Sequence, residues 1–347
     1  MSRLVLIVIS IGLILAAGII FAASLAENLS FRNEVIAEEI PEDVEPNRAE
    51  LVIKTLAAAY PWRIETAEFR EEEDDWALLM DGIWYYYAGG RMLPGDLLED
   101  ADEYAPSFGI FNYQRELPPW REPTQEQTER FSDRGRSNTA SRDNNYRTDD
   151  SNNNNSGSND NERPRIPRRR AYYFHEGLWQ AGSHSESSLR VEPVDFLKSA
   201  LVVHSDIVEV LSEVEERILA AAETDPQVQS WVDNIGDMHG WNWRNVAGSQ
   251  SRSYHSYGIA IDILPKSLGG KETYWQWARE KRSDWWNIPY EDRYHPPDAV
   301  IKAFESYGFI WGGKWPYFDT MHFEYRPEVF ILSGLELETV PQSIVLH

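Results

Sequence analysis

Two segments near the end of the chain alternate strictly between apolar and other residues, and this period of two predicts β-strands. In the segment 259–264, isoleucines occupy every second position and Asp262 lies between two of them. In the segment 321–325, Met, Phe and Tyr alternate with His322 and Glu324. Side chains of a strand alternate between its two faces, so the apolar residues face the core. We therefore expect Asp262, His322 and Glu324 to lie on strand faces opposite the core.

A further histidine, His255, lies seven positions before Asp262. On one continuous strand these two residues would face opposite ways. Gly258 lies between them and can turn the chain, because glycine accepts backbone angles that other residues avoid. A loop carrying His255 and a strand carrying Asp262 can therefore converge on one point. Taken alone, this pair is explained equally well by a buried histidine bonded to a nearby aspartate.

Together with His322, the pair forms a set of three protein ligands that leaves a fourth position open, as in a catalytic zinc site. Zinc would lower the pKa of a bound water to about 7. Asp319, at a turn before the second strand, and Glu324 are both candidates for the general base. Taken by itself, the second segment is better explained as a strand with an exposed His and Glu. The metal site therefore depends on both segments together.

The motif SxHxxGxAxD at residues 253–262, followed by DxxHFE at 319–324, resembles a family of zinc peptidases. These are the D-alanyl-D-alanine carboxypeptidases and L-alanyl-D-glutamate endopeptidases, which cut the stem peptides of bacterial peptidoglycan. The resemblance covers about residues 193–328. It implies an α+β fold like that of lysostaphin and the hedgehog signalling domain, with a small antiparallel sheet and flanking helices. An aspartate at 319 favours the endopeptidase, and the carboxypeptidase is the second alternative.

Carried over by position, the resemblance implies that zinc is bound by His255, Asp262 and His322. Asp319 would be the catalytic base, and Glu324 would be a neighbour of the ligands. The substrate would be a peptidoglycan stem peptide.

The family also uses an upstream arginine that binds substrate and polarises the scissile carbonyl. Arg244 and Arg252 are the two candidates here, and the strand-like setting of Arg244 favours it. The family's usual Tyr-Arg-Ser context is absent, so either one is explained equally well as a surface arginine. Ser253 is expected to brace the site by a hydrogen bond rather than to attack the substrate.

The charge of the chain excludes some partners. It has 57 Asp and Glu residues against 33 Lys and Arg, a formal net charge of −24. A nucleic-acid binder needs a basic face, so we expect no nucleic-acid partner. Cysteine is absent, so neither disulfides nor a lipoprotein anchor can form.

The chain begins with an almost unbroken apolar segment over residues 4–23. Twenty residues at about 1.5 Å each span about 30 Å, the hydrocarbon thickness of a bilayer. Small residues at 22–26 also provide plausible cleavage positions. Residues 1–26 are therefore a signal peptide or a membrane anchor, and the length favours the anchor. Either interpretation predicts a location in the cell envelope, periplasmic or extracytoplasmic, with the chain anchored in the cytoplasmic membrane in the second case.

The remainder divides into three parts. Residues 27–121 are an α/β region of unknown role, in which Trp76–Tyr87 is expected to form a hairpin turning at Asp81-Gly82. Residues 122–170 are a low-complexity segment, rich in Asn, Ser and Arg, that is expected to be disordered. Residues 171–347 are the peptidase domain, with its core at 193–328.

The boundary between the first and last parts has two interpretations. The aromatic segments 108–113 and 172–179 can pair in one sheet, and the low-complexity segment is then a loop insertion rather than a domain boundary.

The function of the protein also has two interpretations. The first is a zinc peptidase, and the alternative is a catalytically inactive, membrane-tethered protein of the same fold that binds or organises the cell wall.

Overall fold

The computed structural model describes residues 45–106, 108, 113–117, 122, 124, 125, 128, 169–245 and 252–338. The apolar segment 4–23 and nearly all of the low-complexity segment lie outside these residues. Within the described ranges, no helix is both long enough and apolar enough to span a membrane. The membrane segment and the disorder of the insertion therefore stay predictions.

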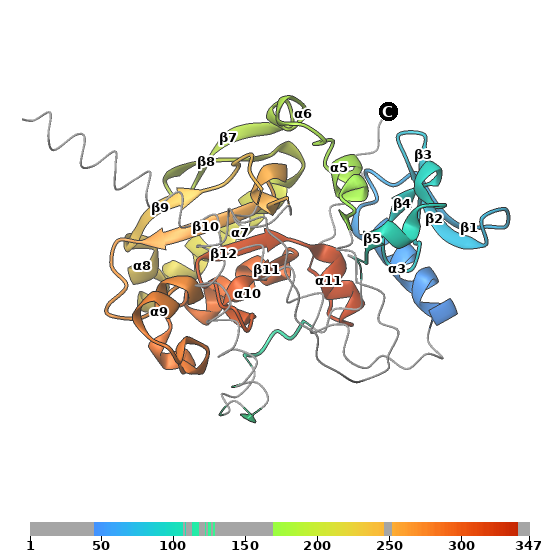
Figure 1. The fold of residues 1–347 in the computed structure, drawn as a ribbon. Coiled ribbons are helices and arrows are strands. Elements are labelled where there is room, and N and C mark those ends of the chain that lie inside the picture. Colours follow the sequence, from blue (N-terminus) through green and yellow to red (C-terminus); the bar gives the residue numbers. More distant parts are fainter. Residues whose placement is uncertain are drawn as a thin grey trace, which may run out of the picture.

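The described helices and strands follow one another along the chain in short runs of one kind (Figure 1). The helices are α3 (Glu45–Ala59), α5 (Tyr173–Leu178), α6 (His184–Ser188), α7 (Val208–Ala222), α8 (Pro226–Asp233), α9 (Trp275–Lys281), α10 (Asp298–Ser306) and α11 (Pro327–Leu332). The strands are β1 (Thr66–Arg70), β2 (Asp75–Met80), β3 (Ile83–Tyr86), β4 (Leu93–Pro94), β5 (Tyr104–Ala105), β6 (Arg169–Arg170), β7 (Val191–Phe196), β8 (Ser199–His204), β9 (Ile235–His239), β10 (Ala260–Pro265), β11 (Phe309–Trp311) and β12 (His322–Tyr325).

The sheet that carries both sequence motifs has the strand order β11-β12-β10-β9, and its neighbours are all antiparallel. Helices α7 and α10 pack against one of its faces, where Phe323 of β12 stacks on Phe304 of α10 with ring centroids 3.9 Å apart. This confirms the predicted α+β class with small antiparallel sheets and flanking helices.

Helix α7 follows from the apolar period of its sequence. Val210, Leu211, Val214 and Ile218 recur at helical spacing and are all buried. The next helix, α8, starts with a proline after Asp225, whose side chain accepts a hydrogen bond from the Gln227 amide at 2.8 Å. The apolar period of α7 and the Asp225-Pro226 start of α8 therefore account for both helices.

The N-terminal region forms a second antiparallel sheet, β1-β2-β3-β4, with α3 packed against it. Asp81 and Gly82 turn the chain between β2 and β3 with φ angles of 49° and 74°. Both angles are positive, as a two-residue hairpin turn that matches the strand twist requires. The predicted hairpin is confirmed.

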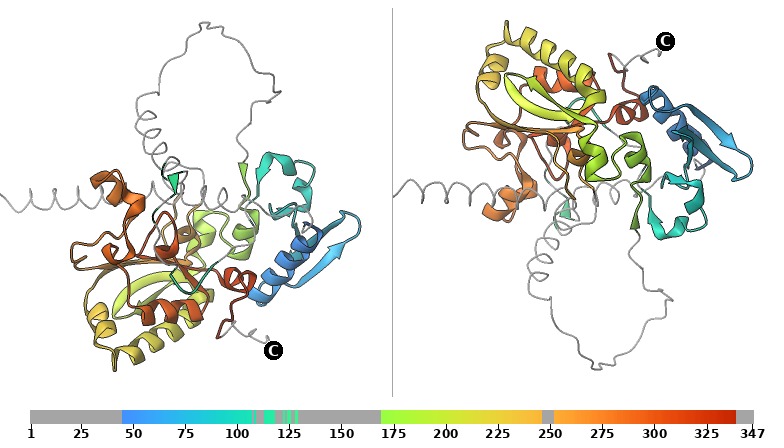
Figure 2. Two further views of the ribbon diagram at one scale, coloured as in Figure 1. Left: turned by 90° about the horizontal axis from the view of Figure 1, so that it is seen from below. Right: turned by 90° about the horizontal axis from the view of Figure 1, so that it is seen from above.

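One hydrophobic core runs through both regions, from Ala49 of α3 to Tyr325 of β12. The two regions lie side by side, with α5 between the N-terminal sheet and the rest of the chain (Figures 1 and 2). The short parallel pair β5-β6 joins Tyr104 to Arg169, so the chain before the low-complexity segment meets the last two residues of that segment. Residues 172–179 do not form the strand that one of the two interpretations of the sequence required. They are mainly helix α5, whose Phe174 and Leu178 are buried in the core.

Candidate metal centre

The pairing of β10 with β12 brings the two sequence motifs together. Asp262 lies opposite His322, and Ala260 lies opposite Glu324. Residues directly opposite in an antiparallel pair share one side of the sheet. Asp262, His322 and Glu324 are therefore on one side, away from the side that α7 and α10 cover. All three are at most 1 % exposed.

A short 3-10 turn, Tyr254–Tyr257, brings His255 to the same place. The Ser253 hydroxyl oxygen accepts a hydrogen bond from the His255 amide at 3.3 Å at the start of this turn. Gly258 ends it with φ 73°, and a Cβ there would lie 2.7 Å from the His204 amide nitrogen of β8. The turn therefore requires glycine for its backbone angle and for the close approach of β8.

Three side chains, His255, Asp262 and His322, offer ligand atoms that all lie within 4.8 Å of one another. His255 Nε2 is 3.1 Å from Asp262 Oδ2, and His322 Nδ1 is 2.8 Å from Asp262 Oδ1. Two ligands about 2.0 Å from a tetrahedral ion lie about 3.3 Å apart, so this spacing suits zinc.

Two of these atoms make no hydrogen bond. His255 Nε2 and Asp262 Oδ2 are buried and lie 3.1 Å from each other, and neither makes a hydrogen bond within the described part of the chain. Burying a polar atom without a partner costs free energy, so such atoms mark a site that binds something else. The donor set of two imidazoles and a carboxylate fits zinc.

The other nitrogen of each histidine has a hydrogen-bond partner. His255 Nδ1 donates to the Gly240 carbonyl at 2.7 Å, which leaves Nε2 with its lone pair. His322 Nε2 lies 3.1 Å from Glu324 Oε2. With the proton on Nε2, Nδ1 of His322 is the atom that faces Asp262. These partners select the tautomer of each ligand and hold its ring in place.

The charges inside this site shift the pKa values of its members. Burial alone would raise the pKa of Asp262, but His255 and His322 lower it well below its usual range. Burial alone would lower the pKa of His322, but hydrogen bonds to Asp262 and Glu324 raise it to about 10. A metal ion must therefore displace a proton from His322 when it binds.

Asp319 lies at the turn before β12 and is 1 % exposed. Its backbone amide donates to the Gly312 carbonyl at 3.0 Å, and its carboxylate accepts from the Met321 amide. Its Oδ1 is buried without a hydrogen-bond partner among the described residues. Burial and the nearby Asp262 carboxylate raise the pKa of Asp319 to about 7. A carboxyl group with such a pKa can take up and release a proton near neutral pH.

The two candidate arginines lie in different surroundings. Burial lowers the pKa of Arg244, and the charges that oppose this shift are those of Asp262, Tyr274 and Asp319. Arg252 instead lies over the Trp243 ring, 3.9 Å from its centroid, and 3.7 Å from Glu176 Oε1. Only Arg244 is therefore placed next to the metal ligands.

The expectation of a strand around Arg244 was wrong. Residues 241–244 form an irregular segment, and Asn245 makes a single bridge to Arg252. The backbone is held by side chains instead, because Ser256 Oγ donates to the Arg244 carbonyl at 2.6 Å.

Sequence reasoning missed the residues that surround Glu324. Arg326 Nη1 lies 3.4 Å from Glu324 Oε1 and donates to Tyr254 Oη at 2.8 Å. Glu328 follows, and Arg326 Nε donates to its carboxylate. The signal was a continued alternation, since His322, Glu324, Arg326 and Glu328 occupy every second position.

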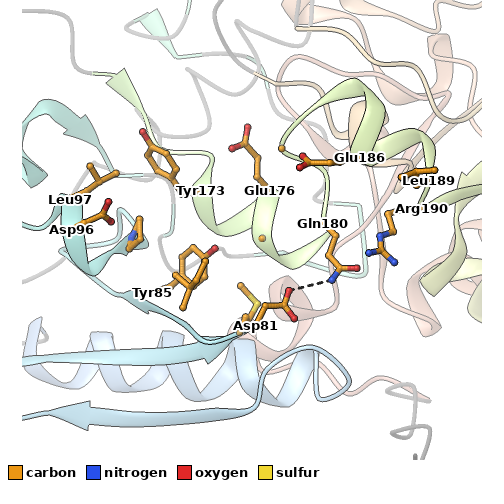
Figure 3. A pocket seen from close by; sticks show the side chains of 15 residues that line it. Asp81, Tyr85, Asp96, Leu97, Tyr173, Glu176, Gln180, Glu186, Leu189 and Arg190 are labelled. Atoms are coloured by element: carbon orange, nitrogen blue, oxygen red, sulfur yellow. Dashed lines mark hydrogen bonds between the residues drawn. The ribbon is translucent and has the colours of Figure 1, made fainter.

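A pocket of about 850 Å³ lies elsewhere, between the N-terminal sheet and helices α5 and α6 (Figure 3). Its charged lining residues are Asp81, Asp96, Glu176, Glu186 and Arg190. None of the metal-centre residues lines it, and its Asp81 carboxylate is already bonded to Gln180. We assign the chemistry to the candidate metal centre, because three buried side chains with metal-ligand atoms come together there.

Comparison with known families agrees with this assignment. Residues 247–325 match the model of a family described as D-alanyl-D-alanine carboxypeptidase. The match contains all three candidate ligands and Asp319, and it supports a peptidase. Residues 52–108 match the model of a domain of unknown function. No curated protein and no solved structure matches the chain.

Proposed function

We propose that this protein is a zinc-dependent peptidase that cleaves the stem peptides of peptidoglycan outside the cytoplasmic membrane. The observation that carries the proposal is the buried set of His255, Asp262 and His322 inside the matched segment. Zinc held by these three residues would supply a Lewis acid that polarises the scissile carbonyl and activates water as the nucleophile.

The residues of the chain then have distinct roles. Gly240 and Glu324 keep the two imidazoles in the tautomers that leave His255 Nε2 and His322 Nδ1 for the ion. Asp319, whose pKa burial raises to about 7, accepts a proton from the attacking water at Oδ1, an atom with no hydrogen-bond partner among the described residues, and passes that proton to the leaving amine. The Arg244 guanidinium is a fixed positive charge beside the site and stabilises negative charge on the substrate oxygen.

The alternative of an inactive wall-binding protein has less support. A binding protein needs neither two buried imidazoles that face one buried carboxylate nor a carboxyl group whose pKa burial raises to about 7. The apolar segment 4–23 supports an envelope location, where a wall peptide is the accessible substrate.

The test is mass spectrometry of muropeptides after incubation with the purified full-length protein, together with its zinc content. Loss of one D-alanine identifies a carboxypeptidase, and cleavage between L-alanine and D-glutamate identifies an endopeptidase. His322→Ala should lose both the zinc and the cleavage. Folded, zinc-loaded protein that leaves every muropeptide intact, and that still binds purified sacculi, would establish the alternative.

A further inference from the structure

We infer that the N-terminal region supports the metal centre through Tyr60, the end of a buried hydrogen-bond chain that leads to His322. This rests on the metal site of the proposed function. Tyr60 lies directly after α3, inside the segment that matches the domain of unknown function. The family match assigns no role to that segment, and the hydrogen-bond chain from Tyr60 to His322 provides one.

The chain runs through side chains that are each at most 3 % exposed. His322 Nε2 lies 3.1 Å from Glu324 Oε2, and Glu324 Oε1 lies 3.4 Å from Arg326 Nη1. Arg326 Nε donates to Glu328 Oε1, and the Tyr60 hydroxyl donates to Glu328 Oε2 at 2.6 Å. A candidate metal ligand is thus linked to the N-terminal region through four consecutive contacts.

Arg326 also connects the second motif to the first. Its Nη1 donates to Tyr254 Oη at 2.8 Å, and Tyr254 immediately precedes His255. The Tyr254 hydroxyl lies 3.3 Å from Nε2 of His175, which burial and Arg326 keep neutral by lowering its pKa to about 3. One guanidinium therefore contacts both the strand that carries His322 and the turn that carries His255.

The role of Tyr60 follows from how the buried carboxylates of Glu324 and Glu328 share their hydrogen-bond donors. Arg326 lies between two carboxylates, Glu324 and Glu328, in a place without solvent. The Tyr60 hydroxyl satisfies one oxygen of Glu328. Without it, that oxygen would draw the guanidinium toward Glu328, because unpaired buried charge is costly. Glu324 would then hold His322 less firmly, and partners of this kind tune metal affinity.

The packing around Tyr60 holds its hydroxyl in position. Its ring makes edge contacts with Trp62 and Trp179, each at a centroid distance of 5.7 Å. Helix α3 packs against α11, the helix that carries Glu328. Tyr60 is 2 % exposed. The N-terminal region is therefore joined to the residues beside the metal centre through the buried hydrogen bond from Tyr60 to Glu328.

The experiment compares Tyr60→Phe with Tyr325→Phe in the full-length protein. Both variants remove one buried hydroxyl, but the Tyr325 hydroxyl has no hydrogen-bond partner among the described residues. Zinc dissociation constants are measured by competition with a chelator. Removing a direct partner of a metal-ligating histidine weakens metal binding about 10–100-fold, which is the range expected for Glu324→Gln. Tyr60 acts three contacts further away, so Tyr60→Phe should weaken binding severalfold, and Tyr325→Phe should leave it unchanged.

A double-mutant cycle separates positioning from general stability. In the Glu324→Gln background the effect of Tyr60→Phe on zinc affinity should disappear, because the chain is already broken there. Its effect on the unfolding free energy of the metal-free protein should remain. Glu328 is the residue that follows Tyr60 in the hydrogen-bond chain, so Glu328→Gln should also weaken zinc binding.

The inference is overturned if Tyr60→Phe binds zinc as tightly as the wild type. It is also overturned if the effect persists unchanged in the Glu324→Gln background, since Tyr60 would then act through overall stability. Wild-type protein that binds no zinc would overturn the proposed function as well. The zinc affinity of the wild type therefore distinguishes the two failures.

Discussion

At the central strand pair β10-β12, the two faces of the sheet are equally buried but carry side chains of opposite chemistry. On one face, Ile261 and Phe323 have no exposed surface and pack into the core beneath α7 and α10. On the other, Asp262, His322 and Glu324 are just as buried and ionisable. Burial of apolar surface stabilises a fold, whereas burial of ionisable groups opposes folding unless they are paired. Stability explains the first face, and the second is the candidate metal centre, whose ionisable groups are paired with one another.

The sharpest test of this difference uses two neighbouring residues of β12. His322→Ala should lose bound zinc and reduce kcat/KM at least about 10⁴-fold, because the Lewis acid is lost. Phe323→Ala should keep the metal ligands but lower the free energy of unfolding by about 3–5 kcal/mol, because it leaves a cavity against Phe304. Zinc analysis, muropeptide turnover and urea unfolding measure the three quantities. Zinc bound normally by the His322→Ala protein would contradict the assignment of the polar face.

Asp319 separates proton transfer from metal binding. Asp319→Asn keeps the shape of the side chain but cannot accept a proton, so kcat should fall about 10³-fold while the zinc affinity stays near that of the wild type. Steady-state kinetics and chelator competition on the same sample measure both. Full activity in this variant would remove Asp319 from the mechanism and leave the metal site itself intact.

The two arginines form a matched pair with different positions. Arg244→Gln removes the positive charge beside the site and should lower kcat/KM about 100-fold. Arg252→Gln removes only the contacts with Glu176 and Trp243, so turnover should change little. The kinetic constants of both variants decide between them. Equal losses of kcat/KM in the two variants would mean that the position of an arginine relative to the metal ligands does not determine its role in catalysis.

The smallest expected effect concerns His175, which borders the buried polar side through Tyr254. Burial and Arg326 lower its pKa to about 3, below the value of about 6.5 in the unfolded chain. Its neutral form therefore stabilises the fold above pH 6.5, and this contribution is lost as the pH falls from 6.5 toward 3. Each pH unit in that interval should lower the free energy of unfolding by about 1.4 kcal/mol.

Urea unfolding of the wild type and His175→Gln at pH 7 and pH 5 measures this difference. Between pH 7 and pH 5, the free energy of unfolding should fall by about 2 kcal/mol less in the variant than in the wild type, since the variant has no imidazole to protonate. Parallel losses in the two proteins would show that His175 is protonated as easily in the folded state as in the unfolded one.

Much of the metal centre could be predicted because it depends on local pattern. The alternation around Asp262 and His322 predicted both strands and the side that each residue occupies, and the strand pairing agrees. Gly258 predicted the turn that brings His255 back, and its positive φ agrees. These inferences succeeded because the period of a strand and the backbone freedom of glycine are properties of a few neighbouring residues.

The rest could not be predicted, because it joins residues that are far apart in the sequence. The choice between Arg244 and Arg252 depends on which irregular segment packs beside Asp262 and Asp319, and no periodicity describes such a segment. One interpretation of the sequence had the 172–179 segment extended, yet Phe174 and Leu178 are buried equally well from a helix.

By itself, the sequence determined the residue types of the metal centre, their order and the side of the strand on which each lies. Only the tertiary structure decided which side-chain atoms face the ion, through the Gly240 carbonyl and the Glu324 carboxylate. It also placed Tyr60, 268 residues away from Glu328 in the chain, at the end of the same hydrogen-bond network. The physical reason is that hydrogen bonds between buried groups depend on positions set by packing, and packing joins elements without regard to their distance in the sequence.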